Sequence, residues 1–193
     1  MMHSMRKLVY YVAATSDGFI AGPDGGYDGF LQSGQFFDDL VAEFPETFPG
    51  AARGPLKISG PNRRFDSVLM GRATWEIGAK QGVDSPYPHL EQFVISSSLT
   101  RISDPAIKLV QSDAPAFVRE LKQRTGKDIW LCGGGQLAAA LFDEIDELIL
   151  KLHPVLIGAG IPLFARQVPA TRMRLLERKP YDDGFIRLHY ALR

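Results

Sequence analysis

The chain has 193 residues, of which 45% are hydrophobic and 23% are charged, and its formal net charge at pH 7 is zero. This composition is typical of a globular protein with a full core, and the lack of a basic excess argues against nucleic-acid binding. The single cysteine, Cys132, excludes an internal disulfide, and no apolar run approaches the ~18 residues of a membrane-spanning helix.

The chain start and the lone cysteine bear on location. The first residues, MMHSMRK, lack the apolar core of a signal peptide. Together with one buried, unreactive thiol in the apolar run IWLC, this predicts a cytoplasmic protein. We expect residues 1–4 to be disordered or expression-derived, and residues 5–193 to form a single domain.

Strand-like and helix-like segments alternate along most of the chain. Residues 7–14 are a continuous apolar run, typical of a strand buried on both faces. The spacing of apolar residues over 34–44 predicts a helix, and the Pro/Gly-rich residues 45–61 predict a long surface loop. Further strands are expected at 67–70, 92–98, 107–111, 127–132 and 146–156, and further helices at 73–79, 114–126 and 133–143. Residues 173–192 predict a terminal hairpin whose turn is PYDDG.

This order of elements predicts the fold class. Alternating strands and helices favour an α/β fold in three layers, with a mostly parallel central sheet and helices on both faces. The terminal hairpin is expected to add an antiparallel edge to that sheet.

The strongest local signal is DIWLCGGGQLAAALF, in which an apolar strand runs into Gly133, Gly134 and Gly135. Three glycines leave the backbone bare, so a ligand can approach it, and free amides at a helix start favour phosphate. A tight turn alone would need only one of the three. The stretch matches the dinucleotide pattern G-x-G-x-x-A, but no acidic residue follows about 20 positions later, which disfavours a standard Rossmann domain.

Two other predicted strand ends carry groups that suit an anion. LMGRATWE places Gly71, Arg72 and Thr74 after one strand, and ISSS places three hydroxyls at the end of another. Arginine offers a planar fork for phosphate. Because ligands of open α/β sheets gather at the carboxyl ends of strands, the three strand ends together predict a phosphate-rich ligand across one sheet edge.

These residues resemble the RibD C-terminal domain family, a group within the dihydrofolate-reductase-like superfamily. The resemblance rests on the motifs YYVAATSDGFIAGPDG, VLMGRATWE, FVISSS, WLCGGGQLAAAL and HPVLIGAGIPLF, which occur in family order and cover most of the chain. The last motif separates this group from true dihydrofolate reductases. The resemblance implies an NADPH-dependent reductase of riboflavin biosynthesis, with a central sheet of about eight strands.

The resemblance also implies a set of cofactor-binding residues, carried over motif by motif. They are Ala13 and Ile20 beside the nicotinamide; Gly71, Arg72, Ala73 and Thr74 at the phosphates and ribose; Ser96 and Ser97 on the adenine side; and Gly133, Gly134, Gly135, Gln136 and Leu137 at the pyrophosphate. A cis peptide between two of these glycines is implied as well. Because Gln136 stands where some relatives have a basic residue, a preference for NADPH would rest on Arg72, with Arg101 as a second candidate.

The substrate side is less specific. True dihydrofolate reductases use a carboxylate on their first helix for proton supply, and Asp39 in FFDDLVAEF is the nearest match, although a solvated helix residue explains it better. On the same segment Phe37, Leu40 and Phe44 are candidates for the substrate pocket and equally for the core. The four histidines show no ligand spacing, so no metal site is expected.

Three functions remain compatible with the sequence. The first is a reductase of the 5-amino-6-(5-phosphoribosylamino)uracil type or for a related pyrimidine or pterin, and the second is a true dihydrofolate reductase. The third is a nucleotide-binding module without turnover. The zinc deaminase signature H-x-E…P-C-x-x-C does not occur, so the chain would not run both riboflavin steps. The expected partners are a small-molecule substrate and a second copy of the chain, paired through the hairpin, without nucleic acid or membrane.

Overall fold

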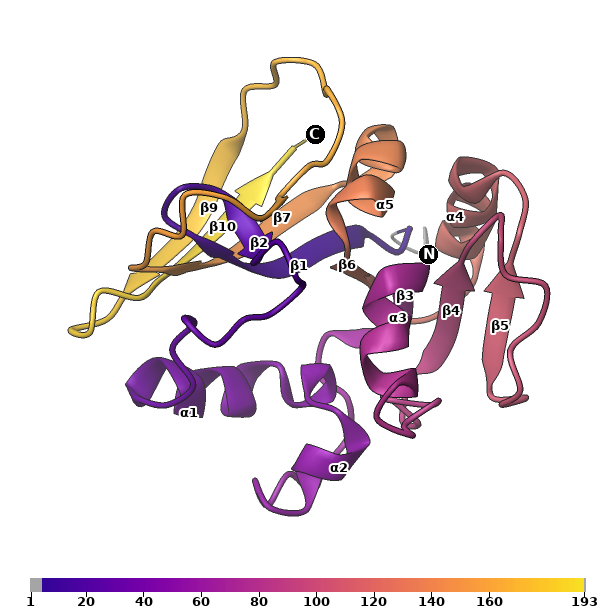
Figure 1. Cartoon of the computed structure of the whole chain (residues 1–193), viewed down its shortest axis with the longest axis horizontal. Coiled ribbons are helices and arrows are strands. Elements are labelled where there is room, and N and C mark those ends of the chain that lie inside the picture. The colour runs from indigo at the N-terminus through magenta and orange to yellow at the C-terminus, as the bar shows by residue number, and fades with distance from the viewer. Residues whose placement is uncertain (1–4, 193) are drawn as a thin grey trace.

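A single eight-stranded sheet forms the centre of the computed structural model, which describes residues 5–192. The expectation for residues 1–4 lies outside the described residues. The strand order is β5-β4-β3-β6-β1-β7-β10-β9 (Figure 1). These strands are β1 (Leu8–Thr15), β3 (Phe65–Gly71), β4 (Glu91–Ile95), β5 (Ile107–Val110), β6 (Asp128–Gly133), β7 (Glu147–His153), β9 (Arg174–Pro180) and β10 (Ile186–Ala191).

The directions of the strands confirm the expected sheet. From β5 to β7 every neighbouring pair is parallel. At the other end β10 pairs antiparallel with both β7 and β9, and β9 and β10 form the predicted terminal hairpin. The protein therefore has the mostly parallel α/β sheet with an antiparallel C-terminal edge that the alternation of elements predicted.

Helices cover both faces of this sheet, as expected. The helices are α1 (Gln35–Glu43), α2 (Gly50–Arg53), α3 (Arg72–Ala79), α4 (Ala114–Gln123) and α5 (Gly135–Ala140), with short 3₁₀ turns η1 (Pro45–Thr47) and η2 (Phe142–Glu144). From α4 and α5, Leu121 and Leu137 enter the apolar cluster on one face. From α1, Phe36 and Leu40 enter the cluster on the other face.

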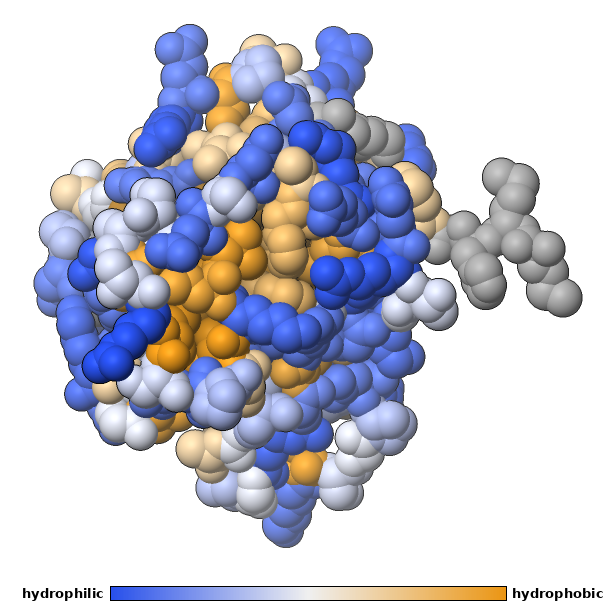
Figure 2. Space-filling view, turned by 90° about the vertical axis from the view of Figure 1, so that its right-hand side faces the viewer, coloured by the Kyte–Doolittle hydropathy of each residue, from blue (hydrophilic) through white to orange (hydrophobic). Residues whose placement is uncertain are grey.

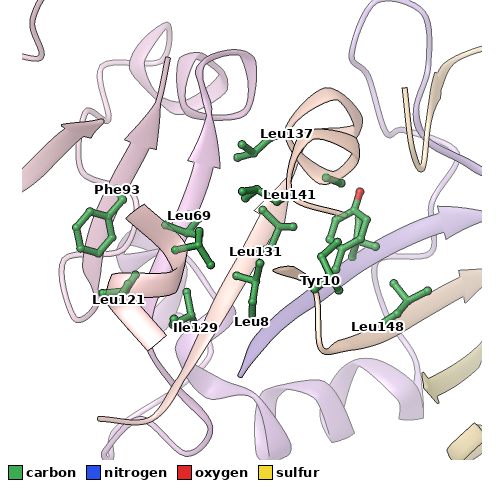
Figure 3. Packing of buried hydrophobic residues seen from close by; sticks show 14 residues of the cluster. Leu8, Tyr10, Leu69, Phe93, Leu121, Ile129, Leu131, Leu137, Leu141 and Leu148 are labelled. Atoms are coloured by element: carbon green, nitrogen blue, oxygen red, sulfur yellow. The ribbon is translucent and has the colours of Figure 1, made fainter. Parts of the chain in front are cut away.

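Strand β1 shows how the two cores are built. Leu8 and Tyr10 point into the cluster shared with Leu131, which Figure 3 shows together with its neighbours. The alternate residues Val9 and Tyr11 point into the opposite cluster. All four are at most 1% exposed. A strand with both faces buried must be apolar at every position, which explains the continuous run seen in the sequence.

Several boundaries differ from the prediction. A second, two-stranded sheet of β2 (Phe19–Ala21) and β8 (Ile161–Pro162) was not predicted, because both pieces are too short for a periodic signal. The segment 45–61 is not a pure surface loop, since it contains η1 and α2 and buries Glu46 completely. Strand β4 ends at Ile95, so the three serines lie in the loop that follows.

The surface over the β5 edge of the sheet is shown in Figure 2, where hydrophobic residues reach the surface among hydrophilic ones. In this view the hydrophobic residues gather left of the centre and are bordered by hydrophilic ones. Across residues 5–192, no helix has the length and apolar character required to cross a bilayer.

Glu147 at the start of β7 links three strands and the segment before β3. Its carboxylate accepts hydrogen bonds from Lys7 Nζ at 2.5 Å and from Arg64, and it lies 2.7 Å from His189 Nε2. Burial on its own raises the pKa of Glu147, but the hydrogen bonds from His189 and Lys7 and the charge of Arg64 outweigh it and lower the pKa to about 2.

This shift predicts an acid-sensitive fold. Because the unfolded state binds a proton more readily, the contribution of Glu147 is fully present above its ordinary pKa of 4.5 and is lost as the pH falls towards about 2. The loss is at most about 3 kcal/mol. Urea unfolding of the wild type and Glu147→Gln between pH 6 and pH 2.5 checks this, with a flatter pH profile expected for the variant. Parallel profiles would contradict it.

Candidate functional site

A pocket of about 280 Å³ opens between α1 and the carboxyl-terminal ends of β1 and β7. The loop before α1 supplies another wall. The lining residues are Tyr11, Ala13, Ile20, Tyr27, Phe30, Leu31, Gln32, Phe36, Phe37, Leu40, Thr47, Phe48, Lys151 and His153. Most of these side chains are aromatic or aliphatic, which is the usual wall of a small-molecule site.

The pocket collects four of the residues expected on the nicotinamide and substrate side: Ala13, Ile20, Phe37 and Leu40. Phe44 is a correction. It does not line the pocket, because its ring lies 4.8 Å from the Tyr11 ring in the core below and only 6% of the residue is exposed. Of the two interpretations left open by the sequence, the core position holds for Phe44.

Asp39 is also placed away from the pocket. Its carboxylate lies 2.7 Å from Lys179 Nζ and accepts a hydrogen bond of 2.8 Å from the Tyr181 hydroxyl. The hydrogen bond from Lys179 is the largest cause of a lowered pKa for Asp39. A carboxylate held ionised against the terminal hairpin, outside the pocket, does not fit the assignment as proton donor.

The sequence argument did not propose Lys151 and His153 on β7 as site residues, although both line the pocket. Lys151 Nζ lies 4.2 Å from the centroid of the Tyr11 ring, and burial lowers its pKa to about 8. A lysine inside the apolar strand LILKLH is unusual, and that was the available signal.

The contacts of His153 are structural. Its Nδ1 accepts a hydrogen bond of 3.1 Å from the backbone N–H of Leu31, which anchors the loop before α1. Burial lowers the pKa of His153 to about 4, so the ring is neutral near pH 7. The aromatic rings of Phe30, Phe36 and Phe185 surround it.

A bare backbone cradle lies at the ends of the neighbouring strands β3 and β6. A Cβ added to Gly71 would be 3.6 Å from the backbone oxygen of Gly133, so the two strand ends almost touch. Gly133 has a φ of +136°, and the peptide between Gly133 and Gly134 is cis, which confirms that expectation. A Cβ on Gly134 would meet only the Thr74 hydroxyl, at 3.5 Å.

The cradle fits the phosphates of a dinucleotide. The Thr74 hydroxyl is the one group that an added Cβ at Gly134 would meet, and no side chain caps the N-terminus of α3, where the backbone amides of Ala73 and Thr74 lie. Of the other residues expected here, Ala73 and Gln136 are exposed, whereas Leu137 is buried in the core beneath α5.

Arg72 connects the cradle to the loop after β4. Its Nη1 donates a hydrogen bond of 3.1 Å to Ser98 Oγ, and its Nε lies 2.6 Å from Glu76. Ser96 is buried and its hydroxyl accepts from the backbone N–H of Leu99, so it shapes the turn, while Ser97 is exposed. Ser98, which the prediction passed over, is the serine that contacts the arginine.

Two further observations limit the chemistry. Burial raises the pKa of the Cys132 thiol to about 11, so it is protonated near neutral pH and a poor nucleophile. Within residues 5–192, no three side chains of His, Cys, Asp or Glu gather as they would around a metal ion.

A sequence model of the RibD C-terminal domain matches residues 6–186, which is nearly the whole chain. The chain belongs to the RibD C-terminal domain family. Its relatives include two Bacillus subtilis (strain 168) proteins that are described as uncharacterised. YwjB is 31% identical over 188 residues, covering 96% of this chain and 98% of YwjB. YyaP is 24% identical over 199 residues, covering 96% of this chain and 94% of YyaP.

Solved structures share the RibD C-terminal fold. A protein of Shewanella sp. PV-4 assigned to riboflavin biosynthesis superposes with a TM-score of 0.74 at 21% identity, over 97% of this chain and 99% of that one. A second structure superposes with a TM-score of 0.65 at 15% identity, over 98% of this chain and 57% of that one. It is the diaminohydroxyphosphoribosylaminopyrimidine deaminase/5-amino-6-(5-phosphoribosylamino)uracil reductase of Thermotoga maritima. At these identities the likeness concerns the fold.

Two of the motifs that carried the RibD C-terminal resemblance are bonded to each other. Asp17 of TSDGFIAG accepts hydrogen bonds from the backbone N–H groups of Ile157, at 3.1 Å, and Gly158, at 2.8 Å. The hydrogen bond from Thr15 is the largest cause of a lowered pKa for Asp17. This contact and the β2–β8 pairing hold Ile20 in the pocket wall.

Proposed function

We propose that the chain is an NADPH-dependent reductase that acts on a small heterocycle, of the 5-amino-6-(5-phosphoribosylamino)uracil reductase type or for a related pyrimidine or pterin. One observation carries this proposal. The neighbouring parallel strands β4, β3, β6, β1 and β7 present, in that order, the serine loop, Gly71–Arg72, the glycine cradle, Ala13 and the Lys151 pocket. A dinucleotide site and a ring-binding pocket therefore share one sheet edge.

The residues divide the work between binding and chemistry. The cradle and Arg72 would hold the phosphates, and Ala13 and Ile20 would form the wall against which the nicotinamide packs. The reduced cofactor supplies the hydride when it is bound. The aromatic lining of the pocket orients a planar substrate and excludes water from it. We propose that residues 5–193 act together as one such domain.

The two other functions are less well supported. Among the described residues that line the pocket, none is acidic, whereas a pterin bound as in true dihydrofolate reductases would need a carboxylate partner there. A module without turnover would leave the pocket beside the cradle unexplained. NADPH oxidation against a panel of pyrimidine and pteridine substrates, beside a direct NADPH titration, separates the three: dihydrofolate turnover favours the second, and binding without any turnover favours the third.

Arg72 is expected to decide the choice of cofactor. An exposed guanidinium beside the cradle can pair with the 2′-phosphate that distinguishes NADPH from NADH. Arg72→Gln should weaken NADPH binding about 10- to 100-fold, the range for a lost charged hydrogen bond, and leave NADH nearly unchanged. Fluorescence titration with both cofactors measures this, and Arg101→Gln shows whether the second arginine contributes. Equal losses for the two cofactors would contradict the assignment.

The assembly and location are proposals as well. Strand β9 is an edge strand, and Met173, Leu175 and Leu176 on and beside it are 39%, 47% and 38% exposed. We propose that this edge pairs two copies of the chain in a homodimer. Sedimentation velocity at micromolar protein tests this, and a monomer would contradict it.

A cytoplasmic location is consistent with the lone cysteine and with the need for reduced cofactor, and fractionation of cells checks it.

A further inference from the structure

Lys151 is the charged group in the pocket that the protein leaves without a counter-ion. It lies on β7 between β1 and β10, in a strand whose other residues are mostly apolar. Among residues 5–192, no carboxylate pairs with its Nζ and no acceptor hydrogen-bonds to it; its contact is with the face of Tyr11 at 4.2 Å. Because an unpaired ammonium that is half-buried costs stability, folding alone does not account for this lysine.

The walls around Lys151 indicate what would pair with it. Six aromatic side chains line the pocket and would surround a flat ring: Tyr11, Tyr27, Phe30, Phe36, Phe37 and Phe48. The other polar lining groups are neutral, namely Gln32, Thr47 and the imidazole of His153. The Lys151 ammonium and the aromatic walls therefore suit a flat ligand that carries an electron-rich oxygen or nitrogen. A ligand that presents a pair of amino donors would find no acidic partner among the described lining residues.

We propose that Lys151 is a catalytic residue that binds the carbonyl oxygen or imine nitrogen of a planar, anionic or carbonyl-rich heterocycle and donates the proton that completes its reduction. This inference rests on the proposed reductase function, which it deepens by naming the substrate class and the proton source. It replaces Asp39, which is bonded to the terminal hairpin outside the pocket.

The proton balance is simple. As the substrate carbon of a C=O or C=N group receives hydride from a reduced nicotinamide, the π electron pair of that bond moves to the oxygen or nitrogen. That atom takes a proton from the Lys151 ammonium, which becomes a neutral amine. Solvent water then reprotonates this amine. The product carries a new C–H bond and a new O–H or N–H bond.

The titration range of Lys151 suits this task. Burial lowers its pKa to about 8, so it is charged at neutral pH and yet a stronger acid than a solvated lysine. On β10, Arg187 lies opposite Lys151 and is ion-paired with Glu43 and Glu177. The other titratable groups that face Lys151 are Tyr11 on β1, Cys132 on β6 and His153 on β7. The first two are protonated near pH 7 because burial raises the pKa of each, and His153 is neutral. Lys151 is thus the titrating group in this part of the pocket.

A binding experiment tests recognition with the whole chain. Orotate, a flat anionic pyrimidinedione, and 2,4-diaminopyrimidine, a flat amino donor, serve as probes in calorimetric titrations. The wild type should bind orotate and discriminate against the diamine, and Lys151→Met should weaken orotate binding about tenfold or more, as expected when a charged hydrogen bond is lost. Lys80→Met, which removes an exposed lysine, is the matched control and should leave orotate binding unchanged.

A second measurement follows the amine itself. In ¹³C NMR of reductively methylated protein, one lysine signal should titrate near pH 8, be absent in Lys151→Met, and move to higher pH when orotate binds. Lys151→Met should also raise the thermal midpoint by a few degrees, because it removes an uncompensated buried charge. This readout shows that the variant is folded, so that a loss of binding is not a loss of structure.

Rates separate recognition from proton donation. Lys151→Arg keeps the positive charge, but a guanidinium cannot give up its proton near neutral pH. The variant should therefore retain its affinity for orotate, and its kcat for NADPH oxidation with the substrate panel should fall about 100-fold. Unchanged orotate affinity and kcat in Lys151→Met would overturn the inference. A wild type that binds NADPH and orotate but reduces no substrate would overturn proton donation. If the wild type does not bind NADPH, the proposed reductase function is contradicted. The orotate titrations would still show whether Lys151 binds an anionic heterocycle.

Discussion

Gly135→Ala is expected to lower the thermal unfolding midpoint by about 6–12 °C, the equivalent of about 3 kcal/mol for a chain of this size. A Cβ at this position would lie 2.2 Å from the backbone oxygen of Pro162 and 3.2 Å from the backbone nitrogen of Ala165. Neither atom is the end of a flexible side chain. Relief therefore requires a shift of the segment that holds β8 against the start of α5.

The same displacement should reach the candidate site. Pro162 on β8 pairs with Phe19 on β2, and β2 carries Ile20 in the pocket wall. Differential scanning calorimetry and NADPH titration of Gly135→Ala measure the two effects together. Gly71→Ala is the control for the thermal midpoint, because an added Cβ there meets nothing closer than 3.6 Å and the backbone is extended. A thermal midpoint equal to that of the wild type would show that the backbone oxygen of Pro162 does not pack closely against Gly135, and would contradict the prediction.

Glu46→Ala is expected to cost about 3–5 kcal/mol of unfolding free energy, because it leaves three backbone donors at the start of β3 without an acceptor. The Glu46 carboxylate is completely buried and accepts hydrogen bonds from the N–H groups of Arg63 at 3.1 Å, Arg64 at 2.6 Å and Phe65 at 2.8 Å. It therefore anchors the strand whose far end is Gly71 and Arg72.

Glu46→Gln is the matched variant. It keeps the side-chain shape and one oxygen acceptor but replaces the other acceptor by an amide donor, so about half the loss is expected. Urea unfolding followed by tryptophan fluorescence measures both variants, because Trp130 is buried on the neighbouring strand β6. An alanine variant as stable as the wild type would mean that water replaces the carboxylate at this strand start.

The predicted site divides between residues that motif reasoning could place and residues that it could not. Gly71, Arg72 and the three glycines belong to stretches where the strand, the turn and the helix start follow each other along the chain, so local sequence places them together. Ser96 and Ser97 were carried over from the resemblance, whereas β4 ends at Ile95 and Ser98, in the turn that follows, is the serine that contacts Arg72. An error of a few residues at a strand end is enough to change which hydroxyl faces a ligand.

Pairings between distant segments were beyond the reach of the sequence. Asp39 resembled a proton donor because it lies on the first helix, but the hairpin more than a hundred residues later supplies Tyr181 and Lys179 as its partners. Glu46 looked like part of a loop until the start of β3 was placed against it. Such contacts depend on tertiary packing, which no local pattern reports.

The amino-acid sequence by itself determined the α/β class, the parallel sheet with its antiparallel edge, and the family, because periodicity, strand-to-helix turns and ordered motifs are local properties of the chain. Only the tertiary structure decided that Lys151 and not Asp39 lines the pocket, and that Phe44 belongs to the core. The physical reason is that a side chain acquires its surroundings, and with them its charge state and its partners, from elements far away in the sequence.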